Sequence, residues 1–341
     1  MIVVGCGALN LDLIYEVEDI GLIARHGFGL SPGRECIMDH HTADRMLHYL
    51  ANEGKLLGKS GGGSSANTLC ALSKMGYRAY FIGSVGEDEA GQYLLESMEE
   101  VDCSLITKSG KSSMCIIVID RLSNDRAMAV VPGTLSIETD NLKMETVLKN
   151  ARLFHMSSFV QEKGPTIHGE LLGLCGQDCL VTFDPGEIYA EKGYSAIKDL
   201  LDQSALLFSS DVEFEAIFRG KSIMEVLSKG LLGRYIRRSC CNSYNFFQKM
   251  PGPVIAKKLG AKGALLASSG LVIKCPAQKV EKIADNTGAG DAFDAGLIDA
   301  IFKNKNPQNA LEEAISIATF SLMFTGRQWI DHLEELRVSP H

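Results

Sequence analysis

The chain has 341 residues, of which 45% are hydrophobic and 22% are charged, as in ordinary globular proteins. A chain of this length buries a core without help from disulfides or metals, and it has room for one large α/β domain or two smaller ones. A net charge of −8 without a long basic run argues against nucleic acid as the main partner.

The sequence also bears on where the protein works. Its first seven residues lack the basic region and the long apolar stretch of a signal peptide, and no apolar run approaches membrane-spanning length. The ten cysteines lie singly or as Cys240-Cys241, without the spacing of a zinc site. We therefore expect a cytoplasmic protein with free thiols and no membrane partner.

Short apolar runs alternate with amphipathic stretches along most of the chain. We predict strands at 2–7, 80–83, 153–157, 180–184 and 206–209, and helices at 65–75, 92–101, 166–175, 194–203 and 212–218. This alternation predicts an α/β fold with a mostly parallel sheet that is covered by helices on both faces.

Two regions break this alternation. Met114–Asp120 and Arg126–Val131 are rich in β-forming residues and predict a hairpin within 110–131. Residues 21–60 have no regular pattern and are expected to form an added lid or interface element. We expect one domain over residues 1–341, with lid elements within 13–60 and 110–131.

A second stretch without a clear pattern is 219–252. It contains the one notable basic cluster of the sequence, made by Arg234, Arg237 and Arg238. We interpret this cluster as solvated surface rather than as a phosphate-binding site.

The most informative stretch is Asp285–Phe293, which reads DNTGAGDAF. Apolar residues follow at four-residue spacing, which predicts a helix from about Ala289 to a point before Pro307. Small residues at a helix start leave backbone N–H groups open. Together with the helix dipole, these groups make an anion site that suits a phosphate.

Asp291 lies at the rim of this predicted anion site. A carboxylate there repels a phosphate, but it can accept the proton of a hydroxyl that attacks the phosphate. The alternative is a glycine-rich turn in which Asp291 is only a first-turn charge that favours the helix dipole. The complete motif at the start of an apolar helix favours phosphoryl transfer, with Asp291 as the general base.

Two stretches near the N-terminus predict the site of the hydroxyl acceptor. Gly7–Asp12 follows the first strand, and Asp12 is a strand-end carboxylate of the kind that holds ligands in α/β sheets. Gly61–Asn67 combines glycines, which let a ligand approach the backbone, with an asparagine that donates and accepts hydrogen bonds. The alternatives are an aspartate that caps its own turn and a flexible linker before a helix.

The motif at 285–293 resembles the C-terminal signature of the ribokinase-like (PfkB) carbohydrate kinase family. The resemblance implies a three-layer domain with a small β-rich lid and an ATP-dependent kinase. It also implies that Gly288, Ala289 and Gly290 form the anion hole and that Asp291 is the base. Asp285 and Thr287 match positions that bind a monovalent cation such as K⁺ in some members, while Asn286 replaces the family's usual threonine.

The acceptor stretches are similar to further motifs of this family. Gly62, Gly63 and Asn67 match its first signature. The stretch that contains Asn10 and Asp12 is similar to the motif whose aspartate holds substrate hydroxyls. The resemblance therefore implies that these five residues bind the acceptor.

The nucleotide side carries weaker matches. The resemblance implies that Glu213 organises Mg²⁺ through water, and Ser210 replaces the asparagine that usually precedes it. Lys258, Gly260 and Gly263 match the strand and turn that cradle ATP, with lysine in place of the frequent threonine. A helix-surface Glu213 and a solvent-facing Lys258 are the structural alternatives.

We therefore expect an ATP-dependent kinase that phosphorylates a hydroxyl of a sugar or related polyol. The alternatives are a nucleoside kinase of the same fold and a non-catalytic regulator that binds a sugar or nucleotide. A dinucleotide-binding dehydrogenase, suggested by Gly5-Cys6-Gly7, lacks the third glycine of its motif because Asn10 stands there. The resemblance also implies a homodimer formed through the small sheet.

Overall fold

The computed structural model describes residues 1–123, 125–233 and 244–338, so the predicted basic cluster of Arg234, Arg237 and Arg238 lies outside the described residues. The strands are β1 (Ile2–Cys6), β2 (Asn10–Val17), β3 (Glu35–Ile37), β4 (Lys55–Gly62), β5 (Arg78–Val85), β6 (Asp102–Lys108), β7 (Ser113–Asp120), β8 (Arg126–Val131), β9 (Leu153–Ser157), β10 (Leu180–Asp184), β11 (Leu206–Ser210), β12 (Val254–Lys258), β13 (Ala264–Ser268) and β14 (Leu271–Cys275).

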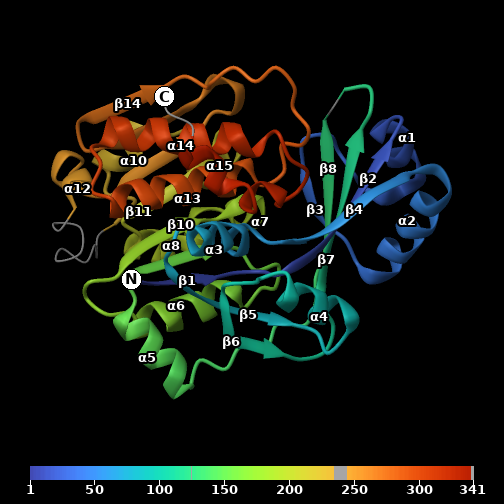
Figure 1. Cartoon of the computed structure of the whole chain (residues 1–341), viewed down its shortest axis with the longest axis horizontal. Helices are drawn as coiled ribbons and strands as arrows, with labels where there is room; N and C mark the ends of the chain where they lie inside the picture. The colour runs from blue at the N-terminus through green and yellow to red at the C-terminus, as the bar shows by residue number, and fades with distance from the viewer. Residues whose placement is uncertain (124, 234–243, 339–341) are drawn as a thin grey trace.

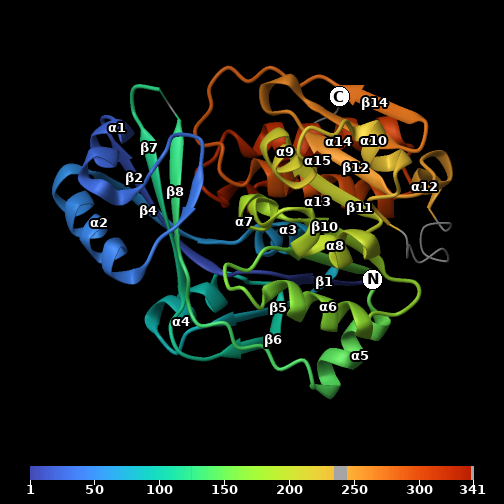
Figure 2. The same ribbon diagram turned by 180° about the vertical axis from the view of Figure 1, so that it is seen from behind.

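The helices surround these strands (Figures 1 and 2). They are α1 (Ile20–Ile23), η1 (Ala24–Phe28), α2 (His40–Glu53), α3 (Ser64–Lys74), α4 (Glu89–Glu96), α5 (Leu142–Asn150), α6 (Gly164–Leu174), α7 (Gly186–Lys192), α8 (Tyr194–Gln203), α9 (Asp211–Phe218), α10 (Ile223–Ser228), α12 (Asn245–Lys249), η2 (Gly260–Lys262), α13 (Ala289–Phe302), α14 (Pro307–Ser321), η3 (Gln328–Ile330) and α15 (Leu333–Val338). None of these described helices is long and apolar enough to cross a membrane.

The larger sheet has nine strands in the order β14-β13-β12-β11-β10-β9-β1-β5-β6. Its strands pair in parallel from β6 to β12, whereas β13 and β14 are antiparallel additions at one edge. Neighbouring residues of a strand enter different cores: Val3 packs on one face of the sheet and Val4 on the other. This burial on both faces explains why the strands are continuous apolar runs.

Helices cover both faces of the larger sheet and give it three layers (Figures 1 and 2). One core includes apolar side chains of α3, α13 and α14, and the other includes side chains of α5, α6, α8 and α9. Leu69 of α3 and Leu297 of α13 are fully buried in the first core. The predicted three-layer α/β fold with a mostly parallel sheet is confirmed.

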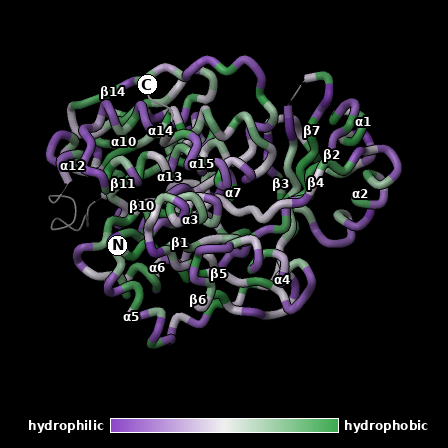
Figure 3. Tube along the Cα trace, in the orientation of Figure 1, coloured by the Kyte–Doolittle hydropathy of each residue, from purple (hydrophilic) through white to green (hydrophobic). Residues whose placement is uncertain are grey.

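A five-stranded mixed sheet, the lid sheet, stands at one end of the molecule with the order β3-β8-β7-β2-β4 (Figure 1). The chain enters it directly from β1, because only Gly7–Leu9 separate β1 from β2. Helix α2 covers one face, where Met46 and Leu50 pack against Ile116 and Val118 of the hydrophobic strand β7 (Figure 3). The predicted hairpin is confirmed as the antiparallel pair β7–β8. The structure contains one chain and does not test the expected homodimer, which stays a prediction.

Two expectations about the lid region are wrong. Residues 21–60 are not irregular, because Asp39 caps the N-terminus of α2 by accepting a hydrogen bond from the Thr42 N–H and the chain then forms β4. Asp12 does not lie in a loop at the end of the first strand. It lies inside β2, which begins at Asn10, so the lid sheet starts before residue 13, where the lid was expected to start.

Since no helix follows β1, the phosphate-binding turn of a dinucleotide-binding dehydrogenase is excluded.

The junction between β4 and α3 depends on Gly63. This residue has a φ of 110°, and a Cβ atom there would lie 2.1 Å from the carbonyl oxygen of Ala8. We expect Gly63→Ala to lower the free energy of unfolding by about 3 kcal/mol, because it adds both backbone strain and a steric clash. Chemical denaturation would measure the change, with Gly58→Ala of β4 as control because its Cβ meets no atom within 4 Å. Equal stability of the two variants would contradict the expectation.

Candidate active site

The N-terminus of α13 is prepared for an anion by a fixed loop. Gly288 caps the helix with a φ of 77° and a ψ of 0°, a left-handed conformation that favours glycine. The Asp285 carboxylate holds the preceding loop by accepting hydrogen bonds from the Thr287 N–H and the Gly326 N–H, both at 2.8 Å. The N–H groups of the first helical turn have no intrahelical acceptor, and that of Ala289 makes only a long hydrogen bond of 3.4 Å to the Asn286 carbonyl oxygen, so a ligand can engage them.

Asp291 lies in this first turn, and a hydrogen bond from a residue of α3 holds its carboxylate in place. Asn67 Nδ2 donates a hydrogen bond of 2.8 Å to Asp291 Oδ2. Burial raises the pKa of Asp291 to about 6, with the Asn67 hydrogen bond opposing the rise and the Asp184 carboxylate adding to it. Such a carboxylate is mostly ionised at pH 7 and binds a proton more readily than an exposed aspartate, as a general base requires.

Asp12 and Gly62 meet across the pair β2–β4. A Cβ atom on Gly62 would lie 2.1 Å from Asp12 Oδ2, so only glycine allows the carboxylate to lie over this backbone. Burial raises the pKa of Asp12 to about 8, Arg327 lowers it, and the charges of Asp291 and of Glu35 raise it further. Because Asp291 acts on Asp12 electrostatically, the structure brings the lid carboxylate and the helix carboxylate into one region.

Two asparagines near these acids carry buried acceptors without partners. Among the described residues, neither Asn10 Oδ1 nor Asn67 Oδ1 has a hydrogen-bond partner. A buried acceptor left without a donor costs about 1–3 kcal/mol, so such atoms indicate a place for a ligand or an ordered water. Hydroxyl groups would satisfy both atoms.

Ser210 and Glu213 have structural partners. They form a capping box at the start of α9, in which the Glu213 N–H donates to Ser210 Oγ at 3.2 Å and the Ser210 N–H donates to Glu213 Oε2 at 2.6 Å. Burial raises the pKa of Glu213, and the neighbouring Asp184 adds to this rise. The capping box explains the pair without a ligand, so their predicted part in binding nucleotide and Mg²⁺ stays a prediction.

Gly260 and Gly263 bound the tight turn between β12 and β13. The Gly263 N–H donates a hydrogen bond of 2.9 Å to the Gly260 carbonyl oxygen. Gly263 has a φ of 94°, and a Cβ there would lie 2.0 Å from the Cys275 carbonyl oxygen. Gly260 meets no atom within 4 Å of its Cβ position, so its surface is open.

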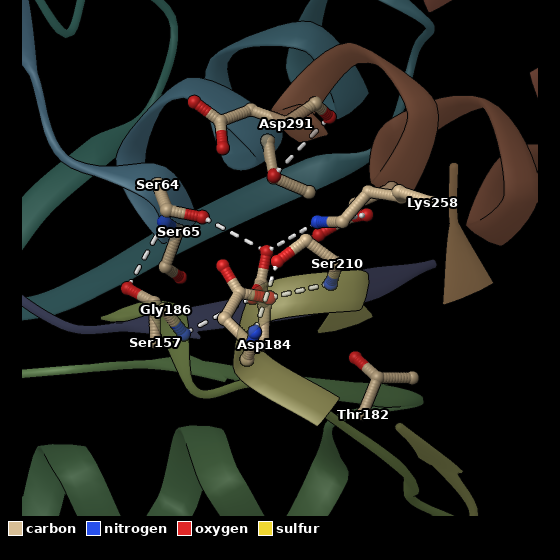
Figure 4. Close-up of polar contacts among 12 residues, drawn as sticks. Ser64, Ser65, Ser157, Thr182, Asp184, Gly186, Ser210, Lys258 and Asp291 are labelled. Atoms are coloured by element: carbon tan, nitrogen blue, oxygen red, sulfur yellow. Dashed lines mark hydrogen bonds and ion pairs between the residues drawn. The ribbon is translucent and has the colours of Figure 1, made fainter. Parts of the chain in front are cut away.

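Lys258 is not solvent-facing, because its side chain is only 17% exposed. Its Nζ lies 2.8 Å from Asp184 Oδ2 and 3.4 Å from Asp294 Oδ1 (Figure 4). A Cβ atom on Gly290 would lie 3.3 Å from the same Nζ. The ammonium group is therefore next to the first turn of α13, where the sequence predicts the phosphate.

The sequence analysis missed Asp184, Asp294 and Arg126. Asp184 ends the predicted strand 180–184 and has the same strand-end signal that singled out Asp12. Asp294 is one turn after Asp291 on an apolar helix, and an acid among apolar residues is a signal for a buried charge. Arg126 of the lid donates from Nη1 to Asn286 Oδ1 at 2.8 Å and to Thr287 Oγ1 at 3.0 Å. No local pattern predicts this contact.

The described side chains limit how this chain could bind a metal ion. Among the described residues, no three His, Cys, Asp or Glu side chains converge in a way that could hold a metal ion. A divalent ion therefore fits this chain only if phosphate oxygens supply most of its ligands, as with nucleotide-bound Mg²⁺. The Asp285 carboxylate is buried and already accepts two backbone N–H groups, and Arg126 already donates to Thr287 Oγ1, so the predicted monovalent cation at Asp285 and Thr287 stays a prediction.

Comparisons with known proteins agree with this geometry. Residues 35–328 match the model of the pfkB family of carbohydrate kinases. An uncharacterized sugar kinase of Archaeoglobus fulgidus is 28% identical over 239 residues, which are 69% of this chain and 87% of that protein. The ATP-dependent 6-phosphofructokinase of Thermoanaerobacterium thermosaccharolyticum is 24% identical over 276 residues, covering 78% and 80% of the two chains.

The fold has a close counterpart among solved structures. The adenosine kinase of Sinorhizobium meliloti superposes with a TM-score of 0.77 at 15% identity, and the match covers 98% of each chain. The family model spans most of the sequence, including the motif at the start of α13. The chain therefore belongs to the PfkB family of carbohydrate kinases, phosphotransferases that act on an alcohol group.

Proposed function

We propose that this chain is an ATP-dependent kinase that phosphorylates a hydroxyl of a sugar or related polyol, with Asp291 as the general base. The observation that carries the proposal is the position of Asp291. Its carboxylate is held by Asn67 in the first turn of α13 and acts electrostatically on Asp12 of the lid sheet. A base, an anion site and acceptor-binding groups in one region are what phosphoryl transfer requires.

The chemical step follows from these positions. Asn10, Asp12 and Asn67 bind hydroxyls of the acceptor, with Gly62 and Gly63 allowing the close approach of their strand. The acceptor oxygen attacks the γ-phosphorus, its proton passes to Asp291, and the bond from the γ-phosphorus to the bridging oxygen breaks as ADP leaves. Backbone amides of Gly288, Ala289 and Gly290, with the helix dipole, stabilise the charge on the transferred group.

The nucleotide would lie along the ends of β11 and β12. Ser210, Lys258, Gly260 and Gly263 line this side in the proposal. Glu213 would hold Mg²⁺ through water, and Asp285 with Thr287 would hold K⁺. The divalent ion supplies positive charge to the phosphates when it is bound.

Most of the sequence relatives favour a sugar as the acceptor, although a nucleoside kinase of Methanothermobacter thermautotrophicus is also 23% identical over 88% of this chain. The relatives at 28% and 24% identity are a sugar kinase and a phosphofructokinase. The likeness to an adenosine kinase is at 15% identity and concerns the fold alone. A regulator without activity is disfavoured, because it would not need a buried carboxylate poised at the start of α13.

The proposal is tested by incubating the protein with γ-labelled ATP, Mg²⁺ and separate sugars, sugar phosphates and nucleosides. We expect label on at least one sugar or sugar phosphate, and no label when Asp291→Asn is used with the same acceptor. Transfer to nucleosides alone would favour the nucleoside alternative. ATP binding without transfer to any acceptor would favour the regulator.

The pH dependence of activity is expected to report Asp291. Its carboxylate accepts a proton only when ionised, and its pKa is raised to about 6, first by burial. The ionised fraction is therefore lost as the pH falls through about 6. We expect kcat/KM for the acceptor to fall about tenfold per pH unit below that value.

The profile is measured from pH 5 to pH 9 at saturating ATP. Asp12, with a pKa of about 8, is expected to add an inflection at higher pH that disappears in Asp12→Asn. The loss of activity as the pH falls through about 6 should remain in that variant. A profile that is flat between pH 5 and pH 7 would contradict the role of Asp291.

A further inference from the structure

A buried cluster of three ionisable side chains lies beside the N-terminus of α13. Lys258 ends β12 and Asp184 ends β10, where the two side chains point toward each other (Figure 4). Asp294 lies one turn into α13, and we call the three residues the Lys258 cluster. Asp184 and Asp294 are 4% and 0% exposed, so both acids are cut off from bulk water, while the Lys258 side chain, at 17%, keeps partial access to it. Buried charges of this kind are costly and are retained where they have a use.

The pKa values of the two acids of the Lys258 cluster are shifted in opposite directions. Burial opposes the charge of Asp184, but the Lys258 ammonium and hydrogen bonds from Asp294 and Lys258 bring its pKa down to about 2. Burial raises the pKa of Asp294 well above its usual range despite Lys258, and the Asp184 charge adds to the rise. Lys258 therefore makes its shorter contact with the acid whose pKa is lowered and its longer contact with the acid whose pKa is raised.

The ammonium group of Lys258 has donor capacity left. It carries three N–H donors, and two of them have acceptors among the described residues, Asp184 at 2.8 Å and Asp294 at 3.4 Å. The longer of these bonds goes to Asp294, whose pKa is raised by burial. An arriving anion can therefore engage Lys258 without breaking its stronger bond to Asp184.

The position of the Lys258 ammonium indicates which anion it meets. A Cβ on Gly290 would lie 3.3 Å from Nζ, so the ammonium group is beside the open amides of the first helical turn. A cation at a helix N-terminus is repelled by the helix dipole. An anion bound at the same amides removes this repulsion, and it then receives both the amide hydrogens and the ammonium charge.

We propose that Lys258 binds the transferred phosphoryl group directly and carries part of its charge in the transition state, while Asp184 and Asp294 hold the ammonium group in place. This inference rests on the proposed kinase function. In this proposal Lys258 is a catalytic residue that contacts the γ-phosphoryl group, rather than a residue that only helps to bind the nucleotide. Asp184 and Asp294 are positioning residues.

The proposed step keeps the charges balanced. The acceptor proton goes to Asp291, and Lys258 stays protonated throughout, because its pKa is held well above its ordinary value by Asp184, Asp294 and Glu213 against the effect of burial. The new O–P bond forms as the bond to ADP breaks. Lys258 therefore contacts a group that ATP has and ADP lacks.

This difference gives a test that does not need turnover. Dissociation constants for Mg-ATP and Mg-ADP are measured without acceptor by calorimetry or by fluorescence of Trp329, the one tryptophan of the chain. Its Nε1 would lie 3.6 Å from a Cβ on Gly288, close to the anion site. In Lys258→Met we expect ATP to bind about tenfold more weakly, with ADP binding unchanged within about twofold.

A second readout is the turnover number with the acceptor identified above. We expect kcat of Lys258→Met to fall about 100-fold, as when a donor to a developing charge is removed. Lys257→Met is the matched control, because Lys257 pairs with Asp211 at 2.7 Å and is not in the cluster. The control should keep the ATP-to-ADP affinity ratio of the wild type.

Removing Lys258 alone leaves the buried Asp184 carboxylate without its partner and could unfold the protein. The double variant Lys258→Met, Asp184→Asn removes both charges and keeps the test valid. Asp184 acts through Lys258 in this proposal. Asp184→Asn should therefore weaken ATP binding selectively in the wild type and have no further effect on the affinity ratio once Lys258 is methionine.

Three results would overturn the inference: an unchanged affinity ratio in Lys258→Met, an equal loss of ATP and ADP affinity, or a kcat within about twofold of the wild type. The kinase proposal fails separately, if the wild type transfers phosphoryl to no acceptor. The affinity ratio still reports on Lys258 in that case.

Discussion

An Asp291→Asn variant is expected to lose about 10³-fold in kcat while its affinity for ATP stays within a few-fold of the wild type. The amide has nearly the shape of the carboxylate and can still accept the hydrogen bond that Asn67 Nδ2 donates at 2.8 Å. It cannot take a proton from the acceptor. The backbone amides of the first turn of α13, which bind the phosphate in the proposal, are unchanged by this substitution.

The measurement is steady-state kinetics with both substrates varied, together with ATP binding in the absence of acceptor. Asp140→Asn serves as a control for a single lost charge, because this residue is exposed and lies in a loop. Turnover close to that of the control would remove Asp291 from the mechanism. Loss of ATP binding in Asp291→Asn would instead indicate a structural role for the carboxylate.

The second large effect is expected from Asp12→Ala. The Asp12 carboxylate lies over Gly62 and is only 8% exposed, so an acceptor hydroxyl that binds it does so away from bulk water. With a pKa of about 8 this acid is mostly protonated at pH 7, and its removal leaves the bound hydroxyl without a partner in a buried place, which costs about 1–3 kcal/mol. We therefore expect the KM for the acceptor to rise about 100-fold, with the KM for ATP nearly unchanged.

Gly62→Ala tests the same contact without removing the carboxylate. Its Cβ would lie 2.1 Å from Asp12 Oδ2 and must push the acid aside. We expect the same selective rise in the acceptor KM. Equal effects of Asp12→Ala on the KM of both substrates would argue against a role in acceptor binding.

The features that the sequence predicts well are local. The motif at 285–293 fixes an unusual backbone turn and a helix start within a few residues, so its anion site is visible without knowledge of the fold. The strands β1, β5, β9, β10 and β11 of the larger sheet are predicted because burial on both faces makes each a continuous apolar run, whereas the edge strand β6 is not predicted. The hairpin β7–β8 is predicted because both of its strands and its turn are adjacent in sequence.

The features that the sequence analysis missed depend on distant residues. The Lys258 cluster joins the ends of two strands to the side of a helix, and only the order of β10, β11 and β12 in the sheet brings them together. Lys258 could therefore be read as solvent-facing. Arg126 reaches the loop before α13 only because the lid sheet stands at that end of the molecule.

Some local patterns have a second explanation that only the structure shows. Gly58, Gly61 and Gly62 made β4 look like a loop, whereas the pairing with β2 and the close approach of Asp12 explain glycine at 62. The capping box of Ser210 and Glu213 has the spacing of a serine followed three residues later by glutamate, which is a known helix-start pattern. That pattern could have identified the pair as a helix cap.

The central claim is that one acceptor hydroxyl meets Asp291 and the γ-phosphate at the start of α13. A crystal structure with a non-hydrolysable ATP analogue and the identified acceptor tests it most directly. We expect the γ-phosphate on the amides of Gly288, Ala289 and Gly290, and the acceptor hydroxyl about 3 Å from the Asp291 carboxylate. A γ-phosphate bound elsewhere, or an acceptor whose hydroxyls all lie beyond hydrogen-bond reach of Asp291, would contradict the account.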